Sequence, residues 1–221
     1  MQPADVKDKL HPKFYQTLVD RGIKEFRPSQ EKSINAGILE GKSIVVCTPT
    51  ASGKTLTAEL AGFNRIMQGK GKAVYIVPLK ALASEKYKEF SKRYPDVKIA
   101  LASGDIDSKD TYLAAYDFIV TTSEKLDSLI RHGAPWIAQL GTIIVDEVHL
   151  LNDQSRGPTL EVVITMLRRI APKAQFLGLS ATIGNPQLLA QWLQAELVED
   201  SWRPVELKRG IYLDCGVEFY E

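Results

Sequence analysis

The sequence has 221 residues, 44% of them hydrophobic, and its 28 basic residues nearly cancel its 27 acidic ones. This length and apolar content predict one domain built around a single sizeable core. The balanced charge provides no argument for binding nucleic acid or a membrane surface, so either function has to be inferred from motifs.

Cysteine content and hydropathy bear on the cellular compartment. Cys47 and Cys215 stand far apart, which argues against a disulfide framework or a zinc cluster and favours a reducing, intracellular environment. The N-terminal stretch MQPADVKDKL has no apolar signal-like core, and no apolar run reaches the ~18 residues that a membrane span needs. We therefore expect a soluble, cytoplasmic protein without a membrane partner.

Two helices are expected before the first strand. Apolar residues at helical spacing predict one over residues 12–21, ended by Gly22, and Pro28 opens a second that runs to Gly41. In the second helix, the Gln30 amide is able to pair with adenine N7 and N6 and so to select ATP over GTP. Alone, Gln30 is also an ordinary polar residue of a first turn. Its position upstream of the next motif favours the adenine role.

Residues 43–55, reading SIVVCTPTASGKT, have the order strand, loop and helix. β-Branched residues predict a buried strand, and apolar residues at three- and four-residue steps after Thr55 predict a helix. This context is typical of a phosphate-binding loop, in which Lys54 reaches the β- and γ-phosphates and the Thr55 hydroxyl ligates Mg²⁺. Thr48 stands where the G-x-x-x-x-G-K-[ST] pattern has its first glycine, and a chance GKT at a turn is the alternative interpretation.

Downstream, short apolar strands alternate with helices. Strands are expected over 73–77, 97–101, 117–121, 142–145 and 175–179, and helices over 79–90, 124–132, 158–170 and 186–194. Ser123 is the expected N-cap of the helix over 124–132. The alternation predicts an α/β fold with a mostly parallel central sheet, helices on both faces, and ligands at the carboxyl ends of the strands.

The strand over 142–145 ends in Asp146-Glu147-Val148-His149, so two neighbouring carboxylates leave the sheet at the edge expected to face the phosphate loop. Asp146 is expected to hold Mg²⁺ through its waters, and Glu147 to orient and deprotonate an attacking water. An isolated acidic pair after a strand is otherwise a solvated loop, and its pairing with the phosphate loop favours catalysis. His149 is either a packed histidine or a hydrogen-bond link between the nucleotide site and a moving part.

Ser180-Ala181-Thr182 follows the strand over 175–179. Small hydroxyl residues at a strand end commonly cap a turn. The hydroxyls of Ser180 and Thr182 are also suited to bond the acidic loop and to sense whether a γ-phosphate is present.

The segments FRPSQ, PTASGKT, PLKAL, DEVH and SAT occur in this order. The ordered set resembles the first RecA-like domain of superfamily 2 helicases of the DExH kind, over nearly all of the chain. The stretches VPLKALASEKYKEF, TTSEKLDSLIRHG, RGPTLE and SWRPVEL are most similar to the Ski-like branch, and within it to the archaeal DNA helicases that act at stalled replication forks. The resemblance implies a RecA-like P-loop NTPase domain.

The resemblance also assigns roles to the matching positions of the nucleotide site. Cofactor binding falls to Phe26, Gln30, Pro49, Thr50, Ala51, Ser52, Gly53, Lys54 and Thr55. The implied catalytic residues are Lys54, Asp146 and Glu147, the Mg²⁺ ligands are Thr55 and Asp146, and the residues that couple hydrolysis to strand movement are His149, Ser180 and Thr182.

Two further segments are implied to contact the backbone of a nucleic-acid strand. They are Pro78, Leu79 and Lys80 in the first segment and Thr121, Thr122 and Ser123 in the second. A lysine and a cluster of hydroxyl and backbone donors ahead of a helix are suited to grip phosphates without reading sequence. Without the resemblance, Lys80 is better interpreted as an exposed surface lysine.

The resemblance divides the chain into residues 1–200, a RecA-like domain with its glutamine-motif helices at 1–41, and residues 201–221, an exit strand toward a second RecA-like domain. In the family that second domain supplies arginines to the ATP site, and an arginine finger contributes roughly 10³- to 10⁵-fold in rate. Arg203 and Arg209 do not stand in such a motif. The chain thus looks like a fragment that is weakly active or inactive alone.

The expected function is the ATP-binding motor half of an ATP-dependent DNA helicase with ATP and Mg²⁺ as cofactors. By resemblance it moves 3′ to 5′ as a monomer and acts on single-stranded or forked DNA in repair. An RNA helicase of the same branch and a nucleotide-dependent nucleic-acid-binding module without activity remain alternatives. A small-molecule phosphotransferase also uses a phosphate loop but has no use for DEVH with SAT.

Overall fold

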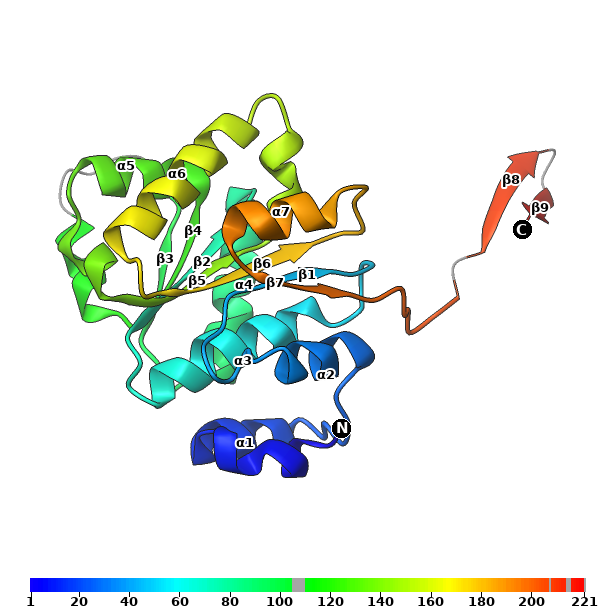
Figure 1. Cartoon of the computed structure of the whole chain (residues 1–221), viewed down its shortest axis with the longest axis horizontal. Helices are drawn as coiled ribbons and strands as arrows, with labels where there is room; N and C mark the ends of the chain where they lie inside the picture. Colours follow the sequence, from blue (N-terminus) through cyan, green and yellow to red (C-terminus); the bar gives the residue numbers. More distant parts are fainter. Residues whose placement is uncertain (105–109, 207, 214–215, 221) are drawn as a thin grey trace.

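A seven-stranded parallel sheet forms the centre of the protein (Figure 1). The computed structural model describes residues 1–104, 110–206, 208–213 and 216–220. Across the sheet the strand order is β3-β4-β2-β5-β6-β1-β7. The strands are β1 (Ile44–Cys47), β2 (Lys72–Val77), β3 (Ile99–Ala102), β4 (Phe118–Thr122), β5 (Leu140–Val145), β6 (Gln175–Ser180) and β7 (Glu196–Glu199).

Helices cover both faces of this sheet, as the sequence predicts. The α-helices are α1 (Pro12–Asp20), α2 (Pro28–Asn35), α3 (Lys54–Met67), α4 (Lys80–Arg93), α5 (Ser123–Arg131), α6 (Gly157–Ile170) and α7 (Pro186–Leu193). Short 3₁₀ helices are η1 (Pro3–Lys9), η2 (Asp110–Ala115), η3 (Pro135–Gln139) and η4 (Val148–Asn152). None of the described helices combines the length and apolar character that crossing a bilayer requires.

Successive residues of each strand alternate between two cores. In β1, Ile44 and Val46 pack with the core under α1 to α4, whereas Val45 and Cys47 pack with the core under α5 to α7. Both faces are apolar because a parallel sheet covered on both sides leaves no strand face to solvent. The continuous apolar runs of the sequence follow from this arrangement, and Cys47 is a buried, free thiol.

Two local expectations are wrong, and one strand forms where none is expected. The helix expected to reach Gly41 ends at Asn35, because the backbone turns at Gly37 (φ 99°) and Gly41 (φ 88°), and Ile38 and Leu39 between them are buried. The N-cap of α5 is Thr122, whose side chain accepts from the Lys125 N–H at 3.4 Å, and not Ser123. The strand β7 is not expected from its sequence, ELVE, because only two of its residues are apolar.

The stretch expected to be an exit strand forms a hairpin. Within its described residues, β8 (Arg209–Leu213) pairs antiparallel with β9 (Gly216–Tyr220), apart from the seven-stranded sheet (Figure 1). Cys215 lies outside the described residues. The role of residues 201–221 as a link toward a second domain stays a prediction.

A buried carboxylate joins three helices on the α1 to α4 face. The side chain of Glu59 in α3 has no exposed surface and accepts hydrogen bonds from Arg21 and Arg93, and from the Tyr94 hydroxyl at 2.9 Å. The two arginines lie at the ends of α1 and α4. A buried charge is tolerated only when it is paired and hydrogen-bonded, so Glu59 fixes how these helices pack on α3.

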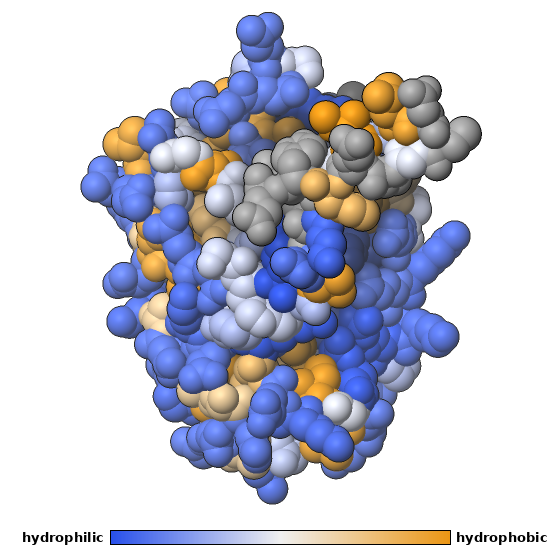
Figure 2. Space-filling view, turned by 90° about the vertical axis from the view of Figure 1, so that its right-hand side faces the viewer, coloured by the Kyte–Doolittle hydropathy of each residue, from blue (hydrophilic) through white to orange (hydrophobic). Residues whose placement is uncertain are grey.

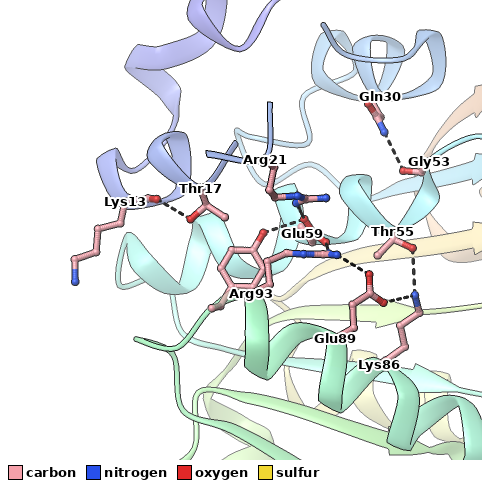
Figure 3. A network of polar contacts seen from close by, with 11 residues as sticks. Lys13, Thr17, Arg21, Gln30, Gly53, Thr55, Glu59, Lys86, Glu89 and Arg93 are labelled. Carbon is pink, nitrogen blue, oxygen red and sulfur yellow. Dashed lines mark hydrogen bonds and ion pairs between the residues drawn. The ribbon is translucent and has the colours of Figure 1, made fainter. Parts of the chain in front are cut away.

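This network continues to the start of α3 (Figure 3). Arg93 also donates to Glu89 at 2.8 Å, Glu89 accepts from Lys86 at 2.8 Å, and the Lys86 ammonium lies 3.4 Å from the Thr55 hydroxyl. Polar contacts therefore run along the interface of α3 and α4 as far as the end of the phosphate loop.

Replacing Glu59 by glutamine removes the charge that the two arginines share. We expect Glu59→Gln to lower the free energy of unfolding by about 3 kcal/mol. This value is at the low end of the range for removing one partner of a buried ion pair, because both arginines are partly exposed to water. Urea denaturation measures this change. Glu85→Gln, the same substitution at an exposed position of α4, is the control and is expected to stay within about 0.5 kcal/mol of wild type. Equal stabilities of the two variants would contradict the role of Glu59.

Candidate active site

Two loops that the sequence singles out lie at one edge of the sheet. The phosphate loop follows β1 and the acidic loop follows β5, and β6 lies between these two strands. Residue pairs such as Cys47 with Ser180 and Val145 with Gly178 keep the three carboxyl ends level. This edge faces right in Figure 1, and hydrophilic residues predominate on it in Figure 2.

Thr48 replaces the glycine of the general pattern because its side chain is part of the loop's structure. Its hydroxyl is buried and hydrogen-bonds the Ser52 hydroxyl at 2.7 Å. Its N–H donates to the Ser180 carbonyl at 3.2 Å. Thr48 thus closes the phosphate loop on itself and ties it to the end of β6.

The loop backbone needs left-handed conformations before the helix begins. Gly53, the N-cap of α3, has φ 101°, and a Cβ there would come within 2.4 Å of the Gln30 Nε2. Only glycine satisfies both constraints. Ala51 has φ 65°, an uncommon conformation for a residue with a side chain. The loop conformation therefore depends on a close approach of its backbone to neighbouring groups. Phosphate binding also requires backbone N–H groups to approach the ligand closely.

Lys54 is held over its own loop. Its ammonium donates to the carbonyls of Thr48 at 3.0 Å and Pro49 at 3.1 Å. Burial lowers the pKa of Lys54 from its ordinary value, and the carboxylates of Glu147 and Asp146 oppose that shift. These two carboxylates are therefore close enough to act on the Lys54 charge, as the predicted convergence of the two loops requires.

The acidic loop leaves the sheet in a conformation of its own. The Asp146 N–H continues the sheet by donating to Ile76 O at 2.8 Å, and Oδ1 of Asp146 accepts from the Glu147 N–H at 3.0 Å. Glu147 then adopts φ 52°, ψ 44° as the N-cap of η4. A left-handed backbone at a non-glycine residue costs on the order of 1–3 kcal/mol and persists where its surroundings impose it. The turn lets both acidic side chains leave the end of β5, which strict strand alternation would prevent.

The groups at this edge fit a magnesium nucleotide. The Thr55 hydroxyl and the Asp146 carboxylate are hard oxygen donors, which Mg²⁺ prefers, and the first turn of α3 supplies N–H groups suited to phosphate. Among the described residues, no cluster of three or more His, Cys, Asp or Glu is able to hold a metal by itself. This donor set suits Mg²⁺, which is usually bound by one or two protein oxygens together with nucleotide phosphates and water.

The predicted adenine residues are both buried. Gln30 is 3% exposed; its Oε1 accepts from the Arg27 N–H at 2.9 Å and its Nε2 donates to the Gly53 carbonyl at 3.0 Å (Figure 3). Phe26 is 5% exposed and packs in the core. Gln30 thus joins the glutamine-motif helix to the phosphate loop, and an adenine would have to share or replace these bonds.

Sequence reasoning missed Arg27 as a site residue. Its guanidinium donates to the Ala51 carbonyl at 2.6 Å and lies 5.5 Å from the Trp202 ring. Arg27 belongs to the FRPSQ segment. Its place in that motif is the sequence feature that could have identified it as a site residue. Its contact gives the phosphate loop a second connection to the start of α2.

The structure brings His149 and the segment Ser180-Ala181-Thr182 together, but through other atoms than expected. The Ala181 N–H donates to His149 Nδ1 at 3.4 Å, and the same nitrogen is 3.4 Å from Glu147 Oε2. The Ser180 hydroxyl is buried and donates to the Ala181 carbonyl, while Thr182 is exposed. His149 therefore links the acidic loop to the end of β6 by way of a backbone N–H.

The two segments proposed to contact nucleic acid are neighbours at the same edge, since Val77 of β2 pairs with Thr122 of β4. Leu79 and Lys80 are exposed at the start of α4, and Pro78 is partly buried. In contrast, Thr121, Thr122 and Ser123 are at most 5% exposed. The Thr121 hydroxyl donates to Ala102 O at 2.8 Å. A contact between this second segment and a nucleic-acid strand would therefore depend on backbone N–H groups at the start of α5.

A cavity of about 550 Å³ is lined by Lys42 and Ser43 before β1 and by residues of α7 and β7. It adjoins the amino end of β1, whereas the phosphate loop follows the carboxyl end. The cavity therefore lies apart from the phosphate loop and the acidic loop.

The parallel sheet with helices on both faces, together with the phosphate loop and acidic loop at one edge, defines a RecA-like α/β domain. The family model of DEAD/DEAH box helicases matches residues 27–189, from the start of α2 into α7. The chain therefore belongs to the DEAD/DEAH box helicase family. Membership of this family implies use of a nucleotide.

Relatives in archaea are similar over almost the whole chain. An "ATP-dependent DNA helicase Hel308" of Pyrococcus horikoshii is 49% identical over 215 residues, which cover 96% of this chain and 29% of the relative. A protein of the same name in Methanocella arvoryzae is 52% identical over 204 residues, covering 90% of this chain and 27% of the relative. The chain thus spans less than a third of the length of these relatives.

Solved structures agree with this assignment. The crystal structure of the DUF1998 helicase MrfA superposes with a TM-score of 0.76 at 30% identity and covers 86% of this chain and 33% of that one. A structure of MrfA bound to DNA and AMPPNP has a TM-score of 0.74 at 27% identity, with 86% and 29% coverage.

Proposed function

We propose that the chain is the ATP-binding motor half of an ATP-dependent DNA helicase. The observation that carries this proposal is the sheet order, which brings the loop of Lys54 and the loop of Asp146 and Glu147 to one carboxyl edge, with the end of β6 between them. The names of the Hel308 relatives support DNA as the substrate, and the solved complex of MrfA with DNA and AMPPNP supports the pairing of a strand with a nucleotide.

In this proposal the phosphate loop and the acidic loop divide the chemistry of ATP hydrolysis. Lys54 and the N–H groups of the loop bind the β- and γ-phosphates, and Gln30 orients the adenine side. Thr55 and Asp146 hold Mg²⁺, which neutralises charge on the phosphates. Glu147 orients the attacking water and accepts its proton.

The proposed coupling of ATP hydrolysis to the nucleic-acid strand depends on the contacts of the end of β6. The Ala181 N–H donates to His149 Nδ1, and His149 belongs to the same loop as Glu147, so a movement of the acidic loop is passed to the segment of Ser180 and Thr182. The segment from Pro78 to Lys80 and the N-terminus of α5 after Thr122 grip the strand backbone. Few phosphates are neutralised by a chain with balanced charge, so strand affinity is weak and falls with salt.

The proposed partners are single-stranded or forked DNA, in repair, and a second RecA-like domain beyond residues 201–221 that supplies the missing arginines. The motor works as a monomer in the cytoplasm, on the nucleoid, and moves 3′ to 5′ like the family that it resembles. An RNA helicase of the same branch stays a second candidate, because phosphate contacts do not by themselves distinguish the sugars.

Lys54→Ala is expected to abolish measurable binding of Mg-ATP by this chain and to leave its far-UV circular dichroism unchanged, because the side chain ends in the loop and not in the core. Isothermal calorimetry measures the affinity. Lys88→Ala, at an exposed position of α4, is the control and keeps wild-type affinity. Unchanged affinity in Lys54→Ala would remove the phosphate loop from the proposal.

Glu147→Gln is expected to bind Mg-ATP like wild type and to lower strand-stimulated turnover by at least about 10²-fold, because it removes the base without removing a metal ligand. Steady-state ATPase is measured with and without single-stranded DNA and RNA, in this chain and in a polypeptide that includes the second RecA-like domain. Glu85→Gln is the matched control. If the longer polypeptide stays inactive with either strand, a nucleotide-dependent binding module replaces the motor.

A further inference from the structure

A buried phenol lies directly beneath the acidic loop. Tyr75, in the middle of β2, has no exposed surface, and its hydroxyl donates to Oδ2 of Asp146 at 2.8 Å. The position is one at which a buried parallel strand ordinarily has an aliphatic residue, and the sequence analysis placed it only within the strand expected over 73–77.

The sheet register explains how a residue of β2 reaches the end of β5. Tyr75 is level with Ile144, two residues before Asp146, and the Asp146 N–H bonds Ile76 of the same neighbouring strand. The Tyr75 ring lies against Phe90 of α4, with ring centroids 5.5 Å apart in an edge-on arrangement. The ring is therefore fixed by packing, and the length of the tyrosine spans the two residues to the carboxylate.

Both oxygens of Asp146 are oriented by donors. Tyr75 holds Oδ2, and the Glu147 N–H holds Oδ1. The phenol hydroxyl is a neutral hydrogen-bond donor at neutral pH. Two donors at opposite oxygens fix the plane of the carboxylate as well as its direction.

We propose that Tyr75 is a positioning residue for the metal of the nucleotide site, because its hydroxyl holds the Asp146 carboxylate in the orientation that receives Mg²⁺. The proposal rests on the function proposed above. Residues that orient a metal ligand typically change metal affinity or activity about 10- to 100-fold when they are removed. Thr55 and Asp146 are the two protein groups proposed to hold the metal, and Asp146 does so through metal-bound water, so the direction of its carboxylate bears on metal affinity.

The competing explanation is that a buried hydroxyl simply bonds whichever acceptor is near. The chain provides a matched control for this explanation. Tyr94 is also buried, at 1% exposed, and its hydroxyl donates to the carboxylate of Glu59 at 2.9 Å. Both tyrosines lose one hydrogen bond to a carboxylate on change to phenylalanine, but only Tyr75 is bonded to a proposed metal ligand.

The test compares Tyr75→Phe with Tyr94→Phe in the 221-residue chain. Mn²⁺ serves as the metal probe, and its binding in the presence of AMPPNP is followed by electron paramagnetic resonance. AMPPNP affinity without metal and the urea unfolding midpoint are measured in parallel. We expect Tyr75→Phe to weaken Mn²⁺ binding about 10-fold or more, without a change in metal-free nucleotide affinity. Tyr94→Phe is expected to lower the midpoint but to keep wild-type Mn²⁺ affinity.

An Asp146→Ala background tests whether the effect acts through the carboxylate. There, Tyr75→Phe is expected to cause no further loss of Mn²⁺ affinity. Equal Mn²⁺ affinity in Tyr75→Phe, Tyr94→Phe and wild type would overturn the positioning role while leaving the proposed function intact. If the wild-type chain binds no Mn²⁺ with AMPPNP, the proposed function fails and the positioning role fails with it.

Discussion

The pairing of β1 with β6 and of β6 with β5 is the constraint on which the proposed site depends. In a parallel sheet these pairings bring the carboxyl ends of all three strands to one edge, although β1 and β5 are separated by about a hundred residues of sequence. The phosphate loop with its lysine and the acidic loop with its two carboxylates lie at that edge because of this register. A shift of one strand would send each group to another level or face.

Polar contacts then connect that edge to its surroundings. Gln30 and Arg27 bond the carbonyls of Gly53 and Ala51, so the start of α2 is attached to the phosphate loop. Lys86 and Glu89 lead from Thr55 along the interface of α3 and α4, and α4 begins at the segment proposed to contact a strand. Tyr75 and His149 attach the acidic loop to β2 and β6. The candidate site is thus bonded to the elements that our proposal asks to bind adenine and phosphate, and to α4, one of the two elements proposed to contact nucleic acid.

The sequence was sufficient for the features that depend on local pattern. Hydrophobic runs and turn residues predicted the helices α1 to α7 and the strands β1 to β6, but not the short 3₁₀ helices, and the GKT and DEVH segments predicted which loops lie at one edge. The sequence was insufficient for features that depend on tertiary contacts. The strand β7 forms because β1 offers it a free edge, and α2 stops at Asn35 because two glycines turn the backbone. Tyr75 looked like a core residue, and only the register of β2 against β5 shows that its hydroxyl meets Asp146.

The most direct test of the central claim is a crystal structure of this chain with Mg²⁺ and a non-hydrolysable ATP analogue. We predict that the metal lies about 2.1 Å from the Thr55 hydroxyl. The β- and γ-phosphates should lie at the start of α3, and Asp146 should reach the metal through water. A nucleotide bound instead in the cavity beside Lys42 and β7, with Thr55 and Asp146 remote from the metal, would contradict the claim that the two loops form one site.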